Sequence, residues 1–305
     1  PFNNELSVVT MTGDQIYTML EQQWQRTLAG AVPSRSFLYL GLSDNVRYTY
    51  HEIADPNIEG ATLGVVDQVF IDGKLVDRDG IYRAGTFTFL ATGGDNFHVF
   101  TEAEVLNTGL LDWQQWLQFL QSESDEGTAG LRAAAGESGA GIAPDFTKQG
   151  IKLDLVPADG KVKAGETLKA TFSNINLHAI GAPENPTAEA TLTTPSGVVS
   201  ATGTISNIQD PETNVWSDSV TFEFKVPAGT TAGASSLEMT AQPTGSLATS
   251  FVEVVAADVP VTPGKPGGEG ALPDTGVSVL WMVLAGVAVL AVGAGVTVRS
   301  RRGEA

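Results

Sequence analysis

Alternating apolar and polar residues recur through residues 153–257. In two examples, residues 167–172 and 220–226, an apolar side chain occupies every second position, which is typical of strands that turn one face toward a core. Turn signals that contain glycine divide the segment at positions 164–165, 195–197, 227–229 and 243–245. The pattern predicts roughly seven strands in an all-β, antiparallel sandwich of immunoglobulin-like type.

Residues 1–150 mix strand and helix patterns instead. The stretch Leu-Ser-Val-Val-Thr-Met at 6–11 predicts a strand, and Thr12–Gln15 resembles a capping box for a helix in which apolar residues recur every four positions as far as Trp24. Asp-Gly at 72–73 favours a two-residue type I′ turn, and further strands are predicted at 38–42, 46–50, 65–70 and 82–89. Helices and hairpins without a βαβ rhythm predict an α+β domain.

Another helix is predicted to begin at Asp112. An aspartate suits the start of a helix, and the apolar face that we expect to point inward carries Trp113, Trp116, Leu117 and Leu120. The stretch that follows, residues 122–142, is rich in Gly, Ala, Ser and Glu. That composition favours a surface excursion over a packed element.

The C-terminal region has a different character. Residues 258–271 carry three prolines and four glycines, which predicts a linker. Residues 277–298 form an uncharged run of 22 residues, and as a helix this run would span about 33 Å, enough for the hydrocarbon core of a membrane. The arginines within 299–302 predict a cytoplasmic C-terminus, with the rest of the chain outside.

A pentapeptide stands directly before this apolar run, formed by Leu272, Pro273, Asp274, Thr275 and Gly276. In this position it resembles the LPxTG cell-wall sorting signal of Gram-positive surface proteins. The resemblance implies that sortase cleaves a membrane-spanning precursor between Thr275 and Gly276 and joins the chain to peptidoglycan. We therefore expect an extracellular, wall-attached protein; an ordinary single-pass anchor is the alternative.

Charge and composition exclude whole classes of function. Lys and Arg number 17 against 35 Asp and Glu, a formal net charge of −18. Basic residues cluster only at the C-terminus, so we expect no nucleic-acid polymer as a partner. The absence of cysteine excludes disulfides and thiolate sites. Three histidines that are far apart in the sequence exclude zinc motifs built on a histidine pair.

Three motifs in residues 1–150 resemble a single family. They are Pro-Phe-Asn-Asn at 1–4, Asp-Gly-Lys-Leu-Val-Asp at 72–77, and Phe-Leu-Ala-Thr-Gly-Gly-Asp at 89–95. Together with Ala-Pro-Asp-Phe at 143–146, they resemble the C-terminal domain of the bacterial 5′-nucleotidase and 2′,3′-cyclic-nucleotide phosphodiesterase family. The resemblance implies a domain that recognises nucleosides or nucleotides.

The same resemblance assigns the base-binding residues. Phe2 and Phe89 match the two aromatics between which the family stacks the nucleobase, and stacking tolerates every base because each has a π face. Asn4 matches a position that contacts the base edge, where an amide both donates and accepts hydrogen bonds. From the sequence pattern alone, Phe89 fits a core position at the end of its strand and Phe2 a frayed terminus.

The ribose side of the implied site lies in the glycine-containing turn. Asp95 matches the acid that accepts hydrogen bonds from ribose hydroxyls, and Gly93 and Gly94 would let the backbone approach the ligand closely. Taken alone, residues 92–95 read as an ordinary tight turn. The family has glycine where this sequence has Asn3 and Asn96, and asparagine tolerates left-handed backbone better than most residues.

Hydrolysis in this family belongs to an N-terminal metallophosphoesterase domain that holds two metal ions. Its D-x-H, G-N-H and G-H-x-H motifs and its arginine-bearing N-G-G-x-R segment do not occur in this sequence, which begins at Pro1 without an initiator methionine or export signal. We therefore expect an upstream partner domain with two divalent metal ions, no catalytic residue and no cofactor in this chain, and no activity from the chain alone.

The predicted organisation has four parts. A 5′-nucleotidase C-terminal substrate-binding domain at 1–150 is followed by an immunoglobulin-like spacer at 153–257, a Pro/Gly linker at 258–271, and the sorting signal, transmembrane helix and basic tail at 272–305. The favoured hypothesis is the nucleoside-recognition part of a cell-surface hydrolase of nucleotide catabolism. Two alternatives stay open: a stand-alone surface nucleoside-binding protein, and a wall-anchored adhesin whose 153–257 module binds host or wall material. For that module by itself, carbohydrate binding with Trp216 stacked on a sugar ring is the alternative to a spacer or adhesive domain.

Overall fold

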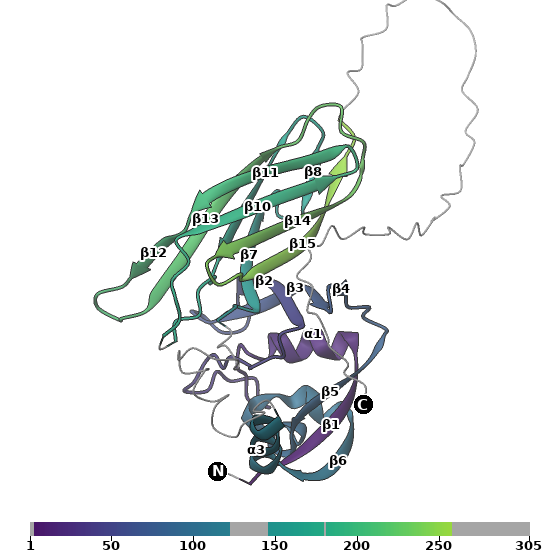
Figure 1. The fold of residues 1–305 in the computed structure, drawn as a ribbon, viewed down its shortest axis with the longest axis vertical. Coiled ribbons are helices and arrows are strands. Elements are labelled where there is room, and N and C mark those ends of the chain that lie inside the picture. Colours follow the sequence, from purple (N-terminus) through teal and green to yellow (C-terminus); the bar gives the residue numbers. More distant parts are fainter. Residues whose placement is uncertain (1–2, 123–145, 180, 258–305) are drawn as a thin grey trace, which may run out of the picture. The chain divides into compact units, whose positions relative to one another are not determined.

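β-Strands dominate the computed structural model, which describes residues 3–122, 146–179 and 181–257 (Figure 1). In the first range the strands are β1 (Glu5–Thr12), β2 (Val46–Ala54), β3 (Thr62–Ile71), β4 (Lys74–Leu75), β5 (Ile81–Phe87) and β6 (Glu104–Leu111). The helices there are α1 (Gly13–Glu21), α2 (Thr88–Ala91) and α3 (Asp112–Ser122), joined by the 3-10 turns η1 (Gly94–Asn96) and η2 (His98–Glu102). The predicted mixture of strands and helices is confirmed.

Helix α1 begins at the predicted capping box. The backbone N–H of Gln15 donates to Thr12 Oγ1 (3.2 Å), and the backbone N–H of Thr12 donates to Gln15 Oε1 (2.9 Å), so two otherwise unpaired donors are satisfied. Ile16 and Leu20 are buried on one face of the helix, and Trp24 is buried just beyond its end. Figure 1 shows α1 between β3 and β1, and it contributes to the core that these strands share.

Strands β5, β1 and β6 form an antiparallel sheet in that order. The inner face of β1 places Val9 and Met11 in the core that also holds Leu20 of α1. On the opposite face Phe87 and Leu106 are 44% and 58% exposed. This face of the small sheet is therefore apolar and open among the described residues.

The β2–β3 pair continues into the predicted hairpin. Asp72 and Gly73 have φ values of 51° and 72°, and positive φ at both central residues is what a type I′ turn requires. The pairing of Phe70 with Leu75 closes the short strand β4 onto β3.

The remaining strands form a two-layer sandwich. Its strands are β7 (Gly150–Val156), β8 (Lys161–Lys163), β9 (Thr167–Ser173), β10 (Thr187–Thr194), β11 (Gly197–Thr204), β12 (Ser206–Gln209), β13 (Trp216–Lys225), β14 (Gly233–Gln242) and β15 (Leu247–Val255). A five-stranded sheet, β11-β10-β14-β15-β8, lies against the layer that contains β13, β9 and β7 (Figure 1). The predicted inward faces of β9 and β13 are buried between the layers. The structure has nine strands here rather than seven, because β8 and β12 are short edge strands with weak alternation.

One sheet crosses the predicted boundary between residues 1–150 and residues 153–257. Its order is β12-β13-β9-β7-β2-β3-β4, and parallel pairing of β2 with β7 joins Tyr48 to Gly150. A second contact joins β3 to β15: Gln68 Nε2 donates to the carbonyl of Phe251 (3.0 Å), and the Phe251 N–H donates to Gln68 Oε1 (2.7 Å). Asn174 Nδ2 also donates to the hydroxyl of Tyr50 (2.7 Å). Residues 1–150 and 153–257 stay predicted domains, but their backbones share hydrogen-bonded sheet.

Three sequence expectations need correction. Residues 38–42 form no strand; the N–H of Leu38 donates to the carbonyl of Gln23 (2.8 Å), just beyond the end of α1. The strand predicted at 82–89 ends at Phe87. Helix α3 begins at Asp112 as predicted, but Trp113 and Trp116 are 43% and 62% exposed rather than inward, because an apolar stripe identifies a face without identifying what covers it.

Several predictions fall outside the described residues. They concern the surface excursion that begins after α3, the linker at 258–271, the sorting signal and the C-terminal transmembrane helix. Within residues 3–122, 146–179 and 181–257, no helix is long and apolar enough to cross a membrane.

Candidate functional site

The candidate base-binding residue Phe89 lies on a short helix rather than on a strand. Strand β5 ends at Phe87, and α2 (Thr88–Ala91) lifts Phe89 away from the core, so that its side chain is 50% exposed. Thr92 Oγ1 donates to the Phe89 carbonyl (2.9 Å). The core position that the strand pattern allowed is therefore wrong, and the ring is available to a ligand.

Gly94 lies directly against Phe89. A Cβ atom added at Gly94 would stand 2.5 Å from the Phe89 carbonyl oxygen and 2.6 Å from Cε1 of its ring, which is far inside van der Waals contact. Gly93 has φ of 84°, a left-handed value that favours glycine. Both glycines are therefore needed for the turn that supports the exposed ring.

The turn continues through left-handed residues. Asp95 and Asn96 have φ values of 51° and 59°, and Asn3 has a φ of 50°. Asparagine and aspartate adopt this conformation more readily than other non-glycine residues. The expectation that asparagine can stand at positions 3 and 96 is therefore confirmed.

Asn4 stands at the start of β1, next to the strand that leads to Phe89. Leu6 pairs with Phe87 across β1 and β5, and Thr88 Oγ1 donates to the carbonyl of Glu5 (2.9 Å). The antiparallel register therefore directs Asn4 toward the neighbourhood of α2. Phe2, the second predicted stacking residue, lies outside the described residues.

Asp95 has a partner that the sequence analysis missed. Nη2 of Arg35 donates to Asp95 Oδ1 at 2.9 Å. Both side chains are partly exposed, at 57% for Arg35 and 38% for Asp95. The carboxylate faces solvent beside a guanidinium.

Buried Gln25 joins the two segments that carry this ion pair. Its N–H donates to the carbonyl of Ser36 (2.9 Å), the residue after Arg35. Its Oε1 accepts from Nδ2 of Asn96 (2.9 Å), the residue after Asp95. Gln25 is 1% exposed, so both segments are fixed by one side chain and its backbone.

The end of the turn is anchored on the segment after α1. The N–H of Val99 donates to Gln22 Oε1 (3.1 Å), and His98 Nε2 lies 3.1 Å from the carbonyl oxygen of Arg26. Phe97 and Phe100 are buried, with ring centroids 6.4 Å apart. These buried rings and hydrogen bonds fix the end of the turn that carries Asp95.

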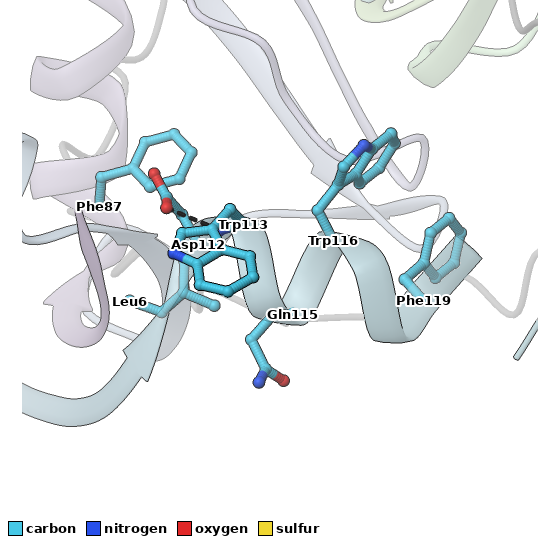
Figure 2. A pocket seen from close by; sticks show the side chains of 7 residues that line it. All are labelled: Leu6, Phe87, Asp112, Trp113, Gln115, Trp116 and Phe119. Carbon is cyan, nitrogen blue, oxygen red and sulfur yellow. Dashed lines mark hydrogen bonds between the residues drawn. The ribbon is translucent and has the colours of Figure 1, made fainter. Parts of the chain in front are cut away.

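An apolar pocket lies on the outer side of the small sheet. It has a volume of about 490 Å³. Figure 2 shows Leu6 of β1 and Phe87 of β5 on one side, with Trp113, Trp116 and Phe119 of α3 along the helix. The N–H of Asp112 donates to the carbonyl of Asn4 (2.9 Å), which ties the start of α3 to the strand that carries a predicted site residue.

An ion pair braces the start of the loop that carries Arg35. Nε and Nη2 of Arg26 donate to Asp55 Oδ2 at 3.1 Å and 2.6 Å, and Nη2 also donates to the carbonyl of Thr62 (2.9 Å). The guanidinium of Arg26, together with the N–H of Asn57, holds the pKa of Asp55 below its ordinary value.

This ion pair predicts a pH effect on folding stability. Because the pKa of Asp55 is lower in the folded than in the unfolded chain, its stabilisation is present above the unfolded pKa, about 4, and is lost as the pH falls through the folded value. Thermal unfolding of the parent chain and Asp55→Asn between pH 7 and pH 3 should show a Tm difference that shrinks on acidification. A constant difference would contradict this assignment.

The histidines do not assemble a metal site. His51 Nδ1 lies 2.8 Å from Asp67 Oδ1, and His178 Nε2 lies 3.3 Å from the buried carboxylate of Asp218. Across the described ranges, no group of three or more His, Asp or Glu side chains is arranged to hold a metal ion.

Arg35 and Gln25 had no signal in the sequence. Arg35 stands in a loop without periodicity, and its partner Asp95 is 60 positions away. Gln25 resembles any polar residue at the end of a helix. Long-range hydrogen bonds of this kind become visible only when the chain is folded.

Two family models match parts of the chain. Residues 1–102 match the model described as 5′-nucleotidase, C-terminal domain. Residues 264–305 match the model described as LPXTG cell wall anchor motif. No curated protein matches the chain.

Proposed function

Because the chain carries a 5′-nucleotidase C-terminal domain and an LPXTG cell wall anchor motif, we propose that it recognises the nucleoside of substrates for a 5′-nucleotidase-type hydrolase. The anchor motif makes it an extracellular protein attached to the cell wall. Its substrates are then nucleotides outside the cell.

The arrangement around Phe89 is the observation that carries this proposal. An exposed aromatic ring rests on Gly94 and is followed within one turn by the carboxylate of Asp95. A flat base stacks on the ring, which contributes about 1–3 kcal/mol per base. The carboxylate accepts hydrogen bonds from the ribose hydroxyls. Asn4 supplies amide groups for the base edge, and Phe2 the opposite face of the stack.

Phosphate-ester hydrolysis is assigned to a metallophosphoesterase domain that is not among these 305 residues. Two divalent metal ions in that domain would activate water and stabilise charge at phosphorus. The residues of this chain bind and orient the nucleoside. The isolated chain is accordingly expected to bind without hydrolysing.

The remaining parts attach this binding unit to the wall. Sortase would cleave between Thr275 and Gly276, so that Thr275 becomes joined to peptidoglycan. The sandwich, which shares a sheet with β2 and β3, would act as a spacer that holds the nucleoside site away from the wall.

Calorimetric titration with two ligands tests this function. Adenosine should bind the chain, and 2′,3′-dideoxyadenosine should bind about 10-fold or more weakly, because it lacks the 2′ and 3′ hydroxyls from which Asp95 accepts hydrogen bonds. Asp95→Asn should reduce the difference between the two ligands. If neither ligand binds, or if both bind equally well, the proposed recognition of nucleosides is wrong.

A further inference from the structure

We propose that Arg35 is a specificity-determining residue of the nucleoside site and that it binds the 5′-phosphate, so that the chain prefers nucleotides to nucleosides. The inference rests on the proposed function, since it takes Asp95 as the residue that binds ribose. It adds a residue that lies outside every motif of the sequence.

The position of Arg35 is set by packing rather than by its charge alone. An exposed ion pair usually contributes little and is easily rearranged. Here the residues that follow Arg35 and Asp95, namely Ser36 and Asn96, are both hydrogen-bonded to buried Gln25. The guanidinium is therefore held beside the ribose-binding carboxylate before a ligand arrives, which lowers the entropic cost of using it.

Arg35 still has donors to offer. The only hydrogen bond that the described structure gives its guanidinium runs from Nη2 to Asp95 Oδ1, and a guanidinium carries five N–H donors. The side chain is 57% exposed, so the remaining donors face solvent. Within the described residues, Asp95 Oδ2 accepts no hydrogen bond from the protein and stays open to a ribose hydroxyl.

Charge requires such a residue if a phosphate is to bind. Acidic residues outnumber Lys and Arg in the whole chain, and its net charge is −18. Asp95 itself would repel a phosphate ester on the same sugar. A guanidinium beside it cancels that repulsion and donates charge-assisted hydrogen bonds to phosphate oxygens.

The ribose ring brings these groups together. The hydroxyls that bind Asp95 and the carbon that bears the 5′-phosphate belong to the same five-membered ring. An arginine that already touches the carboxylate is therefore placed to reach the phosphate without leaving the site. The ligand class assigned to this position is a nucleoside 5′-phosphate.

The test compares AMP with adenosine by calorimetry on the full chain. The parent chain should bind AMP about 10-fold more tightly than adenosine, and Arg35→Ala should bring the ratio of the two Kd values close to one. Arg35→Lys should give an intermediate ratio, because it keeps the charge and loses the planar pair of donors. Arg78→Ala is the matched control, since Arg78 forms a similarly exposed ion pair with Asp14.

The Kd ratio separates this inference from the function on which it rests. Any general disturbance of the ribose site by Arg35→Ala weakens both ligands and cancels in the ratio. If both ligands bind and the ratio is the same in the parent chain and in Arg35→Ala, the role of Arg35 is wrong and the nucleoside site stands. If neither ligand binds the parent chain, the proposed function is wrong and this inference with it.

Discussion

Replacing Phe89 with alanine should weaken adenosine binding by roughly 10- to 100-fold, which corresponds to the loss of one base-stacking contact. The fold should survive, because the ring is half exposed and lies outside the buried core. Calorimetric titration measures the affinity, and thermal unfolding checks that the variant is folded. Unchanged affinity in a folded Phe89→Ala chain would remove Phe89 from the site.

Phe87 provides the matched control. It is an aromatic residue two positions earlier with a similar exposure of 44%, but it belongs to β5 and faces the pocket beside α3 (Figure 2). Phe87→Ala should leave the affinity for adenosine within about twofold, whereas loss of binding in this variant alone would move the base to the α3 pocket.

A second variant changes Gly94, the residue packed against the ring of Phe89. Gly94→Ala would place a methyl group against the ring and carbonyl of Phe89, so the ring must shift and adenosine binding should fall about as far as in Phe89→Ala. Retained binding in Gly94→Ala would show that the ring does not need this support.

Gly150→Ala should lower the free energy of unfolding of the whole described fold by about 3 kcal/mol. The added Cβ would stand 2.2 Å from Cζ and 2.3 Å from the hydroxyl oxygen of Tyr48. That hydroxyl accepts from Gln23 Nε2 (2.9 Å), so overpacking and the loss of a buried hydrogen bond add together. For a chain of this size, Tm should fall by roughly 6–12 °C.

The calorimetric trace of this variant also tests the shared sheet. Because β2 and β7 pair at Tyr48 and Gly150, we expect a single unfolding transition that moves as a whole. Gly229→Ala is the control, since no atom lies within 4 Å of a Cβ at that position. Two transitions, of which only one shifts, would mean that residues 1–150 and 153–257 unfold independently.

Local sequence signals predicted the elements well where a neighbouring residue decides the structure. The capping box at Thr12 and the type I′ turn at Asp72 depend on side chains or φ values within four residues, and both are present. The alternation in β9 and β13 identified their buried faces, because one layer of the sandwich covers each of them.

The same signals failed where a distant partner decides. The apolar face of α3 was expected to be buried, and Trp116 is 62% exposed, because the sequence does not say whether another element covers that face. The pairing of β2 with β7 joins residues about 100 positions apart, and a periodic pattern within one strand does not predict which distant strand pairs with it.

The candidate site divides in the same way. The family resemblance identified Phe89, Gly94 and Asp95, and they lie on α2 and on the 3-10 turn η1 that follows it. Arg35 and Gln25 reach this turn from a different loop, and no motif marks them. The sequence alone therefore did not predict the residues that contact the site from distant segments of the chain.

The most direct test of nucleoside recognition is an NMR experiment on the full chain saturated with adenosine. Intermolecular NOEs should connect the adenine protons to the ring of Phe89 and the ribose protons to Asp95. NOEs from adenine to Trp113 and Trp116 instead, with none to Phe89, would contradict the account.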